Sequence, residues 1–417
     1  QAGVPAADRP VATMAEAIRT WKPQAAEMVS PAEALTQALR QFVVRRGDLA
    51  TVIAGYPWFL DWGRDTLIVA RGLVAAGELD TTEAIVRQFA AFESGGTLPN
   101  MIRGNDASNR DTSDAPLWLY VVCADLAAAR GETAWLETDC QGRPLLTVLT
   151  DLADALLAGT ANGVGVDPAS NLLFSPSHFT WMDTNHPAGS PREGYPIEIQ
   201  ALWYAALAFL GKVLPDAAAE GWRRRAAAVK QAIVDYYYRP QRGYLSDCLH
   251  GAPGTPADGA AADTALRPNQ LLALTLGAVD DPRIVASVLD ACQGLLVPGA
   301  IRSLADQEVS PPLAVHHHGR LLNAPERPYW GRYEGDEDTR RKPAYHNGTA
   351  WAWPFPSFCE AWAGHYGADA HPTALAWLGS AVEKLNQGCL GHLPEVQDGD
   401  APHTDRGCDA QAWSVSE

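Results

Sequence analysis

Several features that mark common protein classes are missing from this sequence. Its 32 basic residues are outnumbered by 49 acidic ones, and the formal net charge of −17 argues against nucleic acid, whose phosphates need a basic face. No apolar run approaches the roughly 20 residues of a membrane span, and the first thirty residues lack the apolar core of a signal peptide. The seven cysteines are widely spaced without a CxxC pair, which excludes a disulfide framework and a zinc site. We therefore expect a cytoplasmic protein with no nucleic-acid or membrane partner.

Apolar and aromatic residues are plentiful by contrast. Hydrophobic residues make up 47% of the 417-residue chain, which is enough for a large core, and charged residues only 19%. The 14 Trp and 12 Tyr exceed what packing usually requires, so some of them should face a ligand. The first residue, Gln1, is not an initiator Met, and we expect a fragment or processed product whose absent N-terminal portion holds part of the function.

Helical periodicity dominates the chain from Pro31 onward. We interpret residues 1–30 as a linker or N-terminal arm, because Ser30-Pro31 combines an N-cap residue with proline at the first helical position. Beyond it, apolar residues recur at the i, i+3, i+4 spacing of amphipathic helices. The predicted helices are 31–46, 65–77, 80–94, 113–130, 144–158, 196–213, 216–238, 268–277, 281–294, 348–365, 370–387 and a last one beginning near 408.

The connections between these twelve segments alternate in length. Those after odd-numbered segments tend to be long and rich in Trp, Gly, Asn, Asp and Arg, whereas the others are mostly short. This alternation favours an all-α fold, an (α/α)6 barrel of six helical hairpins spanning 31–417, with the long loops gathered at one end. The alternatives are an irregular helical protein or two helical domains. Residues 248–266 and 301–347 lack periodicity and are predicted to be exposed loops.

The first long connection, GYPWFLDWGRD at residues 55–65, has the composition of a sugar site. Trp58 and Trp62 can stack on the apolar face of a pyranose, while Arg64 and Asp65 can bind its hydroxyls. Asp65 could instead simply cap the helix that begins there, but capping explains neither the arginine nor the aromatic residues. We expect Arg64 and Asp65 to bind sugar.

Further polar and aromatic residues stand at other helix entrances. Asp114 and Trp118 lie about one helical turn apart on one face, so both could point inward. The remaining substrate-binding candidates in these connections are Asn100, Arg302, Tyr345, His346 and Asn347.

Two carboxylates more than two hundred residues apart are the catalytic candidates. Asp183 ends the stretch FTWMD beside Trp181, and Glu395 ends the stretch GHLPE. Aromatic or apolar neighbours can desolvate such acids and raise their pKa. One could then donate a proton to a glycosidic oxygen while the other takes one from water. Glu198 is a rival proton donor, but its position inside an apolar helical run predicts a buried carboxylate that holds Arg or substrate hydroxyls.

Neither a metal nor a cofactor is expected. His316-His317-His318 has no partner at ligand spacing and is more typical of a solvent-exposed loop. Cys408 could be considered as a nucleophile, but no His/Asn arrangement accompanies it in the sequence.

Ten motifs in order resemble the C-terminal glucosidase domain of glycogen debranching enzymes, the amylo-α-1,6-glucosidase family, and more distantly the glucoamylases. In this chain they read GYPWFLDWGRDT, LPN, SDAPLW, FTWMD, GYPIEIQALWY, RPNQ, IRSL, YHNGTAWAWP, LPE and GCDAQAWS, and they extend from Gly55 to the C-terminus. One departure is that Ala350 and Ala352 stand where bulkier residues are expected.

The resemblance implies an (α/α)6 barrel and an inverting hydrolase that removes α-1,6-linked glucose at branch points of glycogen or limit dextrin. Asp183 would be its general acid and Glu395 its general base, while Arg64 and Asp65 would hold the non-reducing-end glucose. Inversion would require the two carboxyl groups to lie on the order of 6.5–9.5 Å apart. The alternatives are a glucoamylase-like α-1,4-glucosidase, a disaccharide phosphorylase and an inactive carbohydrate-binding module.

Overall fold

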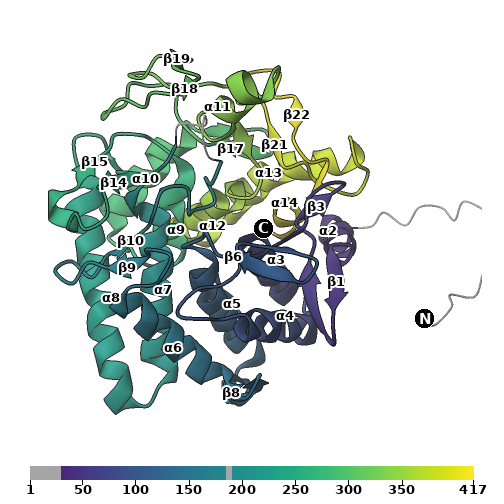
Figure 1. The fold of residues 1–417 in the computed structure, drawn as a ribbon. Helices are drawn as coiled ribbons and strands as arrows, with labels where there is room; N and C mark the ends of the chain where they lie inside the picture. Colours follow the sequence, from purple (N-terminus) through teal and green to yellow (C-terminus); the bar gives the residue numbers. More distant parts are fainter. Residues whose placement is uncertain (1–29, 185–189) are drawn as a thin grey trace, which may run out of the picture.

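A computed structural model describes residues 30–184 and 190–417, so the predicted arm at 1–30 lies outside the described residues except for Ser30. The described chain is predominantly helical (Figure 1). Its α-helices are α2 (Pro31–Arg40), α3 (Gly63–Ala75), α4 (Leu79–Ala91), α5 (Ala115–Arg130), α6 (Leu145–Ala158), α7 (Ile197–Val213), α8 (Asp216–Tyr237), α9 (Leu271–Thr275), α10 (Pro282–Gln293), α11 (Lys342–Tyr345), α12 (Phe355–Tyr366), α13 (His371–Val382) and α14 (Ala412–Ser416).

Each of the twelve predicted helical segments overlaps one of these helices, and the two largest boundary errors are the end of the first segment and the start of the tenth. The helix predicted at 31–46 ends at Arg40, because the β-branched pair Val43-Val44 enters a hairpin that turns at Gly47, whose φ is +58°. The helix predicted at 348–365 begins only at Phe355, after a short strand. The start of α2 is confirmed, since Ser30 forms a capping box with Glu33.

Short antiparallel strands occupy many of the connections. They are β1 (Val43–Arg46), β2 (Leu49–Val52), β3 (Gly55–Tyr56), β4 (Asp61–Trp62), β5 (Met101–Arg103), β6 (Asp106–Asn109), β7 (Asp139–Cys140), β8 (Arg143–Pro144), β9 (Gly165–Val166), β10 (Leu173–Phe174), β11 (Gly194–Pro196), β12 (Tyr238–Arg239), β13 (Tyr244–Leu245), β14 (Cys248–His250), β15 (Ala261–Ala262), β16 (Leu296–Val297), β17 (Ala300–Arg302), β18 (His316–His317), β19 (Arg320–Leu321), β20 (Ala350–Trp351), β21 (Val396–Gln397), β22 (Asp405–Arg406) and β23 (Ala410–Gln411).

Two stretches predicted to be exposed loops therefore contain regular structure. Residues 248–266 carry β14 and β15, which extend a sheet that starts at β11, and Cys248 and Leu249 are buried. Residues 301–347 carry β18, β19 and α11. The short strands escape a periodicity search because two or three residues are too few to establish an alternating pattern.

Burial alternates along the helices. In α3, α5 and α7 consecutive residues are buried on every side, whereas α4, α6 and α8 bury one face at the i, i+3, i+4 spacing. A helix that is apolar all round belongs inside a fold, and an amphipathic one covers it. The enclosed helices follow one another in space, since α14 packs on α3, α3 on α5, α5 on α7, α7 on α9 and α9 on α12 (Figure 1).

The two ends of the described chain meet beside the entrance to α3. Strand β23 pairs with β3, which places Gln411 opposite Gly55. Helix α14 lies so close to α3 that a Cβ on Gly72 would approach the Cβ of Ser416 to 2.6 Å. A five-stranded sheet in the order β16-β17-β20-β21-β22 connects the loop around Tyr345 with the one around Glu395. These pairings bring the entrance to α3, the loop around Tyr345 and the loop around Glu395 close together.

Among the helices of the described residues, none combines the length and the apolar character that crossing a bilayer would require.

Candidate active site

A narrow pocket opens where these loops converge. Seven of the predicted site residues line it together, although they come from four separate stretches of the chain. They are Trp62, Arg64, Asp65, Trp181, Asp183, Tyr345 and Glu395. The structure thus brings both catalytic candidates and the predicted sugar-binding pair Arg64 and Asp65 into one cavity.

Arg64 stands in the first turn of α3 and is buried. Its Nε donates to Asp114 Oδ2 at 2.5 Å and its Nη1 to Asp183 Oδ2 at 3.2 Å. Asp114 precedes the first residue of α5 and is itself buried, so this ion pair holds the guanidinium in place. The remaining nitrogen, Nη2, is buried without a hydrogen-bond partner among the described residues. A buried donor in this state is costly and is suited to a ligand oxygen.

Asp65 is the next residue and faces the same pocket. It does not cap α3, because the N-cap position is Trp62 and no side chain caps this helix. Burial raises the pKa of Asp65 to about 8, against the attraction of Arg64 and with a further upward contribution from the carboxylates of Asp183 and Glu395. Asp65 can therefore exchange hydrogen bonds with hydroxyl groups as donor or acceptor near neutral pH.

Glu395 lies immediately before β21 and is 3% exposed. Its Oε1 accepts a hydrogen bond from the Tyr345 hydroxyl, and its Oε2 accepts one from the Cys408 backbone N–H at 2.9 Å. Burial raises the pKa of Glu395 to about 7, while these two donors oppose the rise. The carboxylate is consequently poised to gain or lose a proton close to neutrality.

Asp183 lies in the connection between β10 and β11. Its side chain is 28% exposed and is held by Arg64. Burial raises its pKa, and the guanidinium of Arg64 works in the opposite direction. Asp183 and Glu395 are thus two carboxyl groups with different partners, a cation for the first and two neutral donors for the second.

Aromatic rings form much of the remaining wall. The Trp181 ring makes edge contacts with Trp351 at 5.0 Å and with Trp353 at 5.1 Å between ring centroids. Tyr345 lies 4.7 Å from Trp351. These contacts fix rings that can stack on the apolar face of a sugar.

The other predicted binding residues lie outside this lining. Trp58 is 57% exposed, and Trp118 is buried in α5 with the Arg71 guanidinium near its ring. Asn100 accepts the Gly63 N–H through its backbone oxygen, so it supports the start of α3. Asp114 does not line the pocket either, but it holds Arg64, which does.

Four further candidates contact other parts of the protein. Glu198 binds Arg192, as expected of a carboxylate that holds an arginine. Arg302 donates to the Gly399 carbonyl oxygen. His346 is buried behind Trp181, with its ring centroid 5.4 Å away, and Asn347 accepts a hydrogen bond from Arg267. These residues support the loops around the pocket.

Sequence reasoning missed four lining residues: Phe59, Trp351, Gln411 and Trp413. Gln411 Oε1 and Trp413 Nε1 are both buried without a hydrogen-bond partner among the described residues. Both residues belong to the motif GCDAQAWS, so the signal was present in the sequence. It pointed to the segment but not to which side chains turn inward.

No cluster of three or more His, Cys, Asp or Glu side chains with metal-binding geometry occurs within 30–184 and 190–417. The histidine run at 316–318 forms part of a small hairpin, β18 with β19.

The fold is one shared with glycosidases of known structure. A rhamnosidase from Klebsiella oxytoca with rhamnose bound matches with a TM-score of 0.53 and 14% identity over 93% of this chain, which spans 62% of that protein. Two structures of glycosidase variants, the first of them in complex with glucose, each match with a TM-score of 0.59 at 14% and 13% identity, over 93% of both chains. A search of curated proteins found no match.

The family to which the chain belongs says more about its activity than the shared fold does. The chain belongs to the amylo-alpha-1,6-glucosidase family, whose model matches residues 37–417. Membership supports glycoside hydrolase activity and a carbohydrate substrate, and it confirms the resemblance drawn from the motifs.

Proposed function

We propose that this protein is an inverting glycoside hydrolase that releases α-1,6-linked glucose from branch points of glycogen or limit dextrin, with Asp183 as general acid and Glu395 as general base. The observation that carries the proposal is the convergence of these two carboxyl groups with Arg64 and Asp65 in one aromatic pocket. Family membership favours the 1,6 linkage.

The partners of the two acids support their roles. A general base must be ionised before it can accept a proton from water, and Glu395 accepts hydrogen bonds from Tyr345 and Cys408 that favour the carboxylate. Asp183 is the more exposed of the two, so the oxygen of a leaving sugar can reach it. Burial raises the pKa of both acids, so their partners and their exposure, rather than the direction of these shifts, distinguish the two roles.

The unpartnered polar atoms support the binding of a single glucose at the bottom of the pocket. Arg64 Nη2 and Trp413 Nε1 would donate to its hydroxyl oxygens, Gln411 Oε1 would accept from a hydroxyl, and Asp65 would do either. Trp62 and Trp181 would contact its apolar face. The inverting stereochemistry further requires room for a water between Glu395 and the anomeric carbon.

The scaffold of the proposal is an (α/α)6 barrel formed by residues 31–417 as one catalytic domain. The alternation of enclosed and amphipathic helices, and the spatial series from α14 to α12, support it. A cytoplasmic setting belongs to the same proposal and agrees with the seven free thiols.

Glucose release tests the proposal directly. The enzyme is given an α-1,6-glucosyl-branched limit dextrin and, separately, a linear α-1,4 maltooligosaccharide, and the anomer released is followed by NMR. We expect β-glucose from the branched substrate. Preference for the linear substrate would indicate a glucoamylase-like enzyme, dependence on phosphate a phosphorylase, and binding without release a carbohydrate-binding module.

A further inference from the structure

The segment that leads to Asp183 has neither helix nor strand of its own, and side chains from other parts of the chain hold it in place. The Phe179 carbonyl oxygen accepts hydrogen bonds from the backbone N–H of Ser113 at 2.8 Å and from its hydroxyl at 3.1 Å. Thr180 Oγ1 accepts from Arg192 Nη1 at 3.0 Å. Both residues therefore have fixed anchors.

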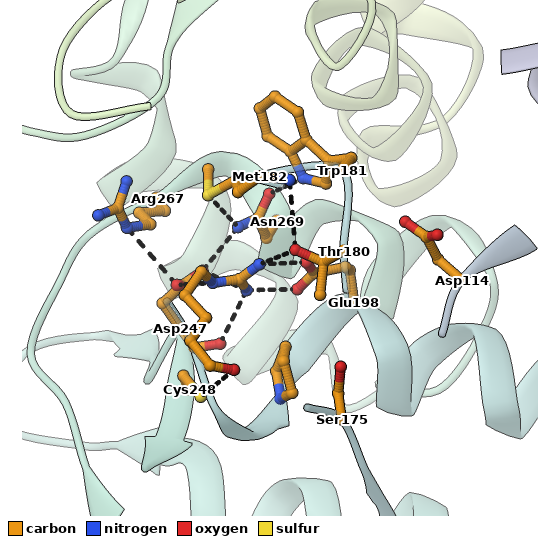
Figure 2. Close-up of polar contacts among 12 residues, drawn as sticks. Asp114, Ser175, Thr180, Trp181, Met182, Glu198, Asp247, Cys248, Arg267 and Asn269 are labelled. Atoms are coloured by element: carbon orange, nitrogen blue, oxygen red, sulfur yellow. Dashed lines mark hydrogen bonds and ion pairs between the residues drawn. The ribbon is translucent and has the colours of Figure 1, made fainter. Parts of the chain in front are cut away.

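Trp181 carries the anchor nearest to Asp183. Its indole Nε1 donates to the side-chain oxygen of Asn269 at 2.7 Å (Figure 2). Asn269 belongs to the short 3₁₀ turn Pro268–Gln270 that opens α9 and is 3% exposed. The hydrogen bond thus joins residues 179–183, here called the catalytic loop, to the turn that opens α9.

A carboxylate sets the orientation of the Asn269 amide. Its Nδ2 donates to Asp247 Oδ1 at 2.7 Å, and an ionised carboxylate can only accept. The NH2 group must therefore face Asp247, which leaves the amide oxygen to face the Trp181 indole. By orienting the Asn269 amide, Asp247 acts on the segment that contains Trp181 and Asp183.

Asp247 is itself held in a buried ion-pair cluster. Arg192 Nε binds its Oδ2 at 2.6 Å, and Glu198 binds Arg192 through both carboxylate oxygens. Arg267 Nε lies 3.5 Å from the same Asp247 oxygen (Figure 2). All four side chains are no more than 3% exposed. Removing one partner of such a cluster leaves an uncompensated buried charge, so the cluster is a rigid base for Asn269.

We propose that Asn269, oriented by Asp247, is a positioning residue that aims Asp183 at the leaving oxygen by fixing the Trp181 indole. This inference rests on the proposed function, in which Asp183 is the proton donor. A general acid must lie within hydrogen-bond reach of the oxygen it protonates, and displacement by about 1 Å can reduce the rate on the order of 100-fold.

The test compares substrates that differ in their need for protonation. A branched 1,6-glucoside requires acid assistance to expel a sugar alcohol, whereas α-glucosyl fluoride expels fluoride, a far weaker base. Asn269→Leu keeps the number and branching of the side-chain heavy atoms and removes the hydrogen bonds to Trp181, Asp247 and the Met182 sulfur. We expect kcat for the branched substrate to fall by about 10–100-fold, and kcat for the fluoride by less than about 3-fold.

The matched control is Gln270→Met, in the same turn. Gln270 is also buried and makes two hydrogen bonds, to the Leu245 N–H and the Arg267 carbonyl oxygen, but neither reaches the catalytic loop. This variant should lower the melting temperature as Asn269→Leu does, and it should affect the two substrates equally.

The outcomes separate the inference from the proposed function. If Asp183→Asn shows the substrate-dependent loss and Asn269→Leu loses activity equally on both substrates, Asn269 has only a structural role and the inference is overturned. If Asp183→Asn itself reduces both rates equally, Asp183 is not the proton donor and the proposed function fails first. Circular dichroism of each variant confirms that the folded enzyme is being compared.

Discussion

The Tyr345 hydroxyl donates a hydrogen bond to the carboxylate of Glu395. Tyr345 is the last residue of α11 and Glu395 directly precedes β21, so the pair connects two loops of the five-stranded sheet region. The ring of Tyr333 lies beside that of Tyr345, with 5.2 Å between the ring centroids and a tilt of 32°. Because this donor stabilises the ionised form of Glu395, it sets the pH at which a water could be activated.

Tyr345→Phe should therefore move the acidic limb of the pH profile. In the folded enzyme the pKa of Glu395 is about 7, and kcat/KM should rise with pH as this base ionises. Loss of the donor raises that pKa, so the limb should shift upward by about one pH unit, roughly 1.4 kcal/mol of hydrogen-bond energy. Rates of both enzymes on the branched substrate between pH 5 and 9 measure the shift. If the acidic limb of the pH profile does not move, a group other than Glu395 is responsible for it.

Asp183→Asn and Glu395→Gln should each remove proton transfer while preserving the shape of the pocket. We expect kcat to fall by about 10²–10⁴-fold with KM within about 3-fold of the parent enzyme. Steady-state kinetics together with calorimetric binding of glucose separate the two effects. A near-normal rate in either variant would contradict the role assigned to that residue, and a loss of glucose binding without a loss of kcat would reassign it to recognition.

Local patterns predicted most of the helices and singled out two acids that line the same pocket, because each leaves a local signature. The spacing of apolar residues in α4, α6 and α8 reports burial directly, and Asp183 and Glu395 are surrounded by apolar neighbours in the sequence. Glu198 was expected to hold an arginine, and its partner Arg192 is only six residues away. These features depend on interactions within one stretch of the chain.

Pairing between distant stretches left no such signature. Gln411 turns into the pocket because β23 pairs with β3, more than three hundred residues earlier. Trp58 was expected to stack on a sugar, but its side chain is 57% exposed and lies outside the pocket. Trp62, from the same loop, lines the pocket. Tertiary packing decides which aromatic residue of a loop faces the pocket. The composition of the loop therefore does not predict this orientation.

Gln411→Leu should weaken recognition of one sugar hydroxyl. The Oε1 atom is buried and unpartnered among the described residues, so a substrate hydroxyl would supply its hydrogen bond, typically worth about 0.5–1.5 kcal/mol. We expect kcat/KM to fall by about 2–13-fold, and the loss to vanish for a substrate that lacks the matching hydroxyl. Deoxyglucosyl fluorides identify the position. Gln307→Leu, outside the pocket, is the control and should leave kcat/KM unchanged.

Asp65→Asn should stabilise the fold while it damages activity. Asp65 has a pKa of about 8 in the folded protein and an ordinary value of 3.8, so between these pH values the folded state binds more protons than the unfolded one. The free energy of unfolding contributed by Asp65 therefore falls as pH rises through this window. Asparagine does not titrate and escapes this loss.

The melting temperature of Asp65→Asn should accordingly exceed that of the parent by at least about 2 °C at pH 8, with the difference shrinking toward pH 4. Activity on the branched substrate should fall at every pH, because asparagine replaces one of the two carboxyl oxygens with an NH2 group that can only donate to a hydroxyl. Calorimetric scans of the variant and the parent at pH 5 and pH 8 measure this difference in melting temperature. A variant that is less stable at pH 8 than the parent would mean that Asp65 is satisfied by Arg64 as an ionised pair, and that burial does not dominate its protonation.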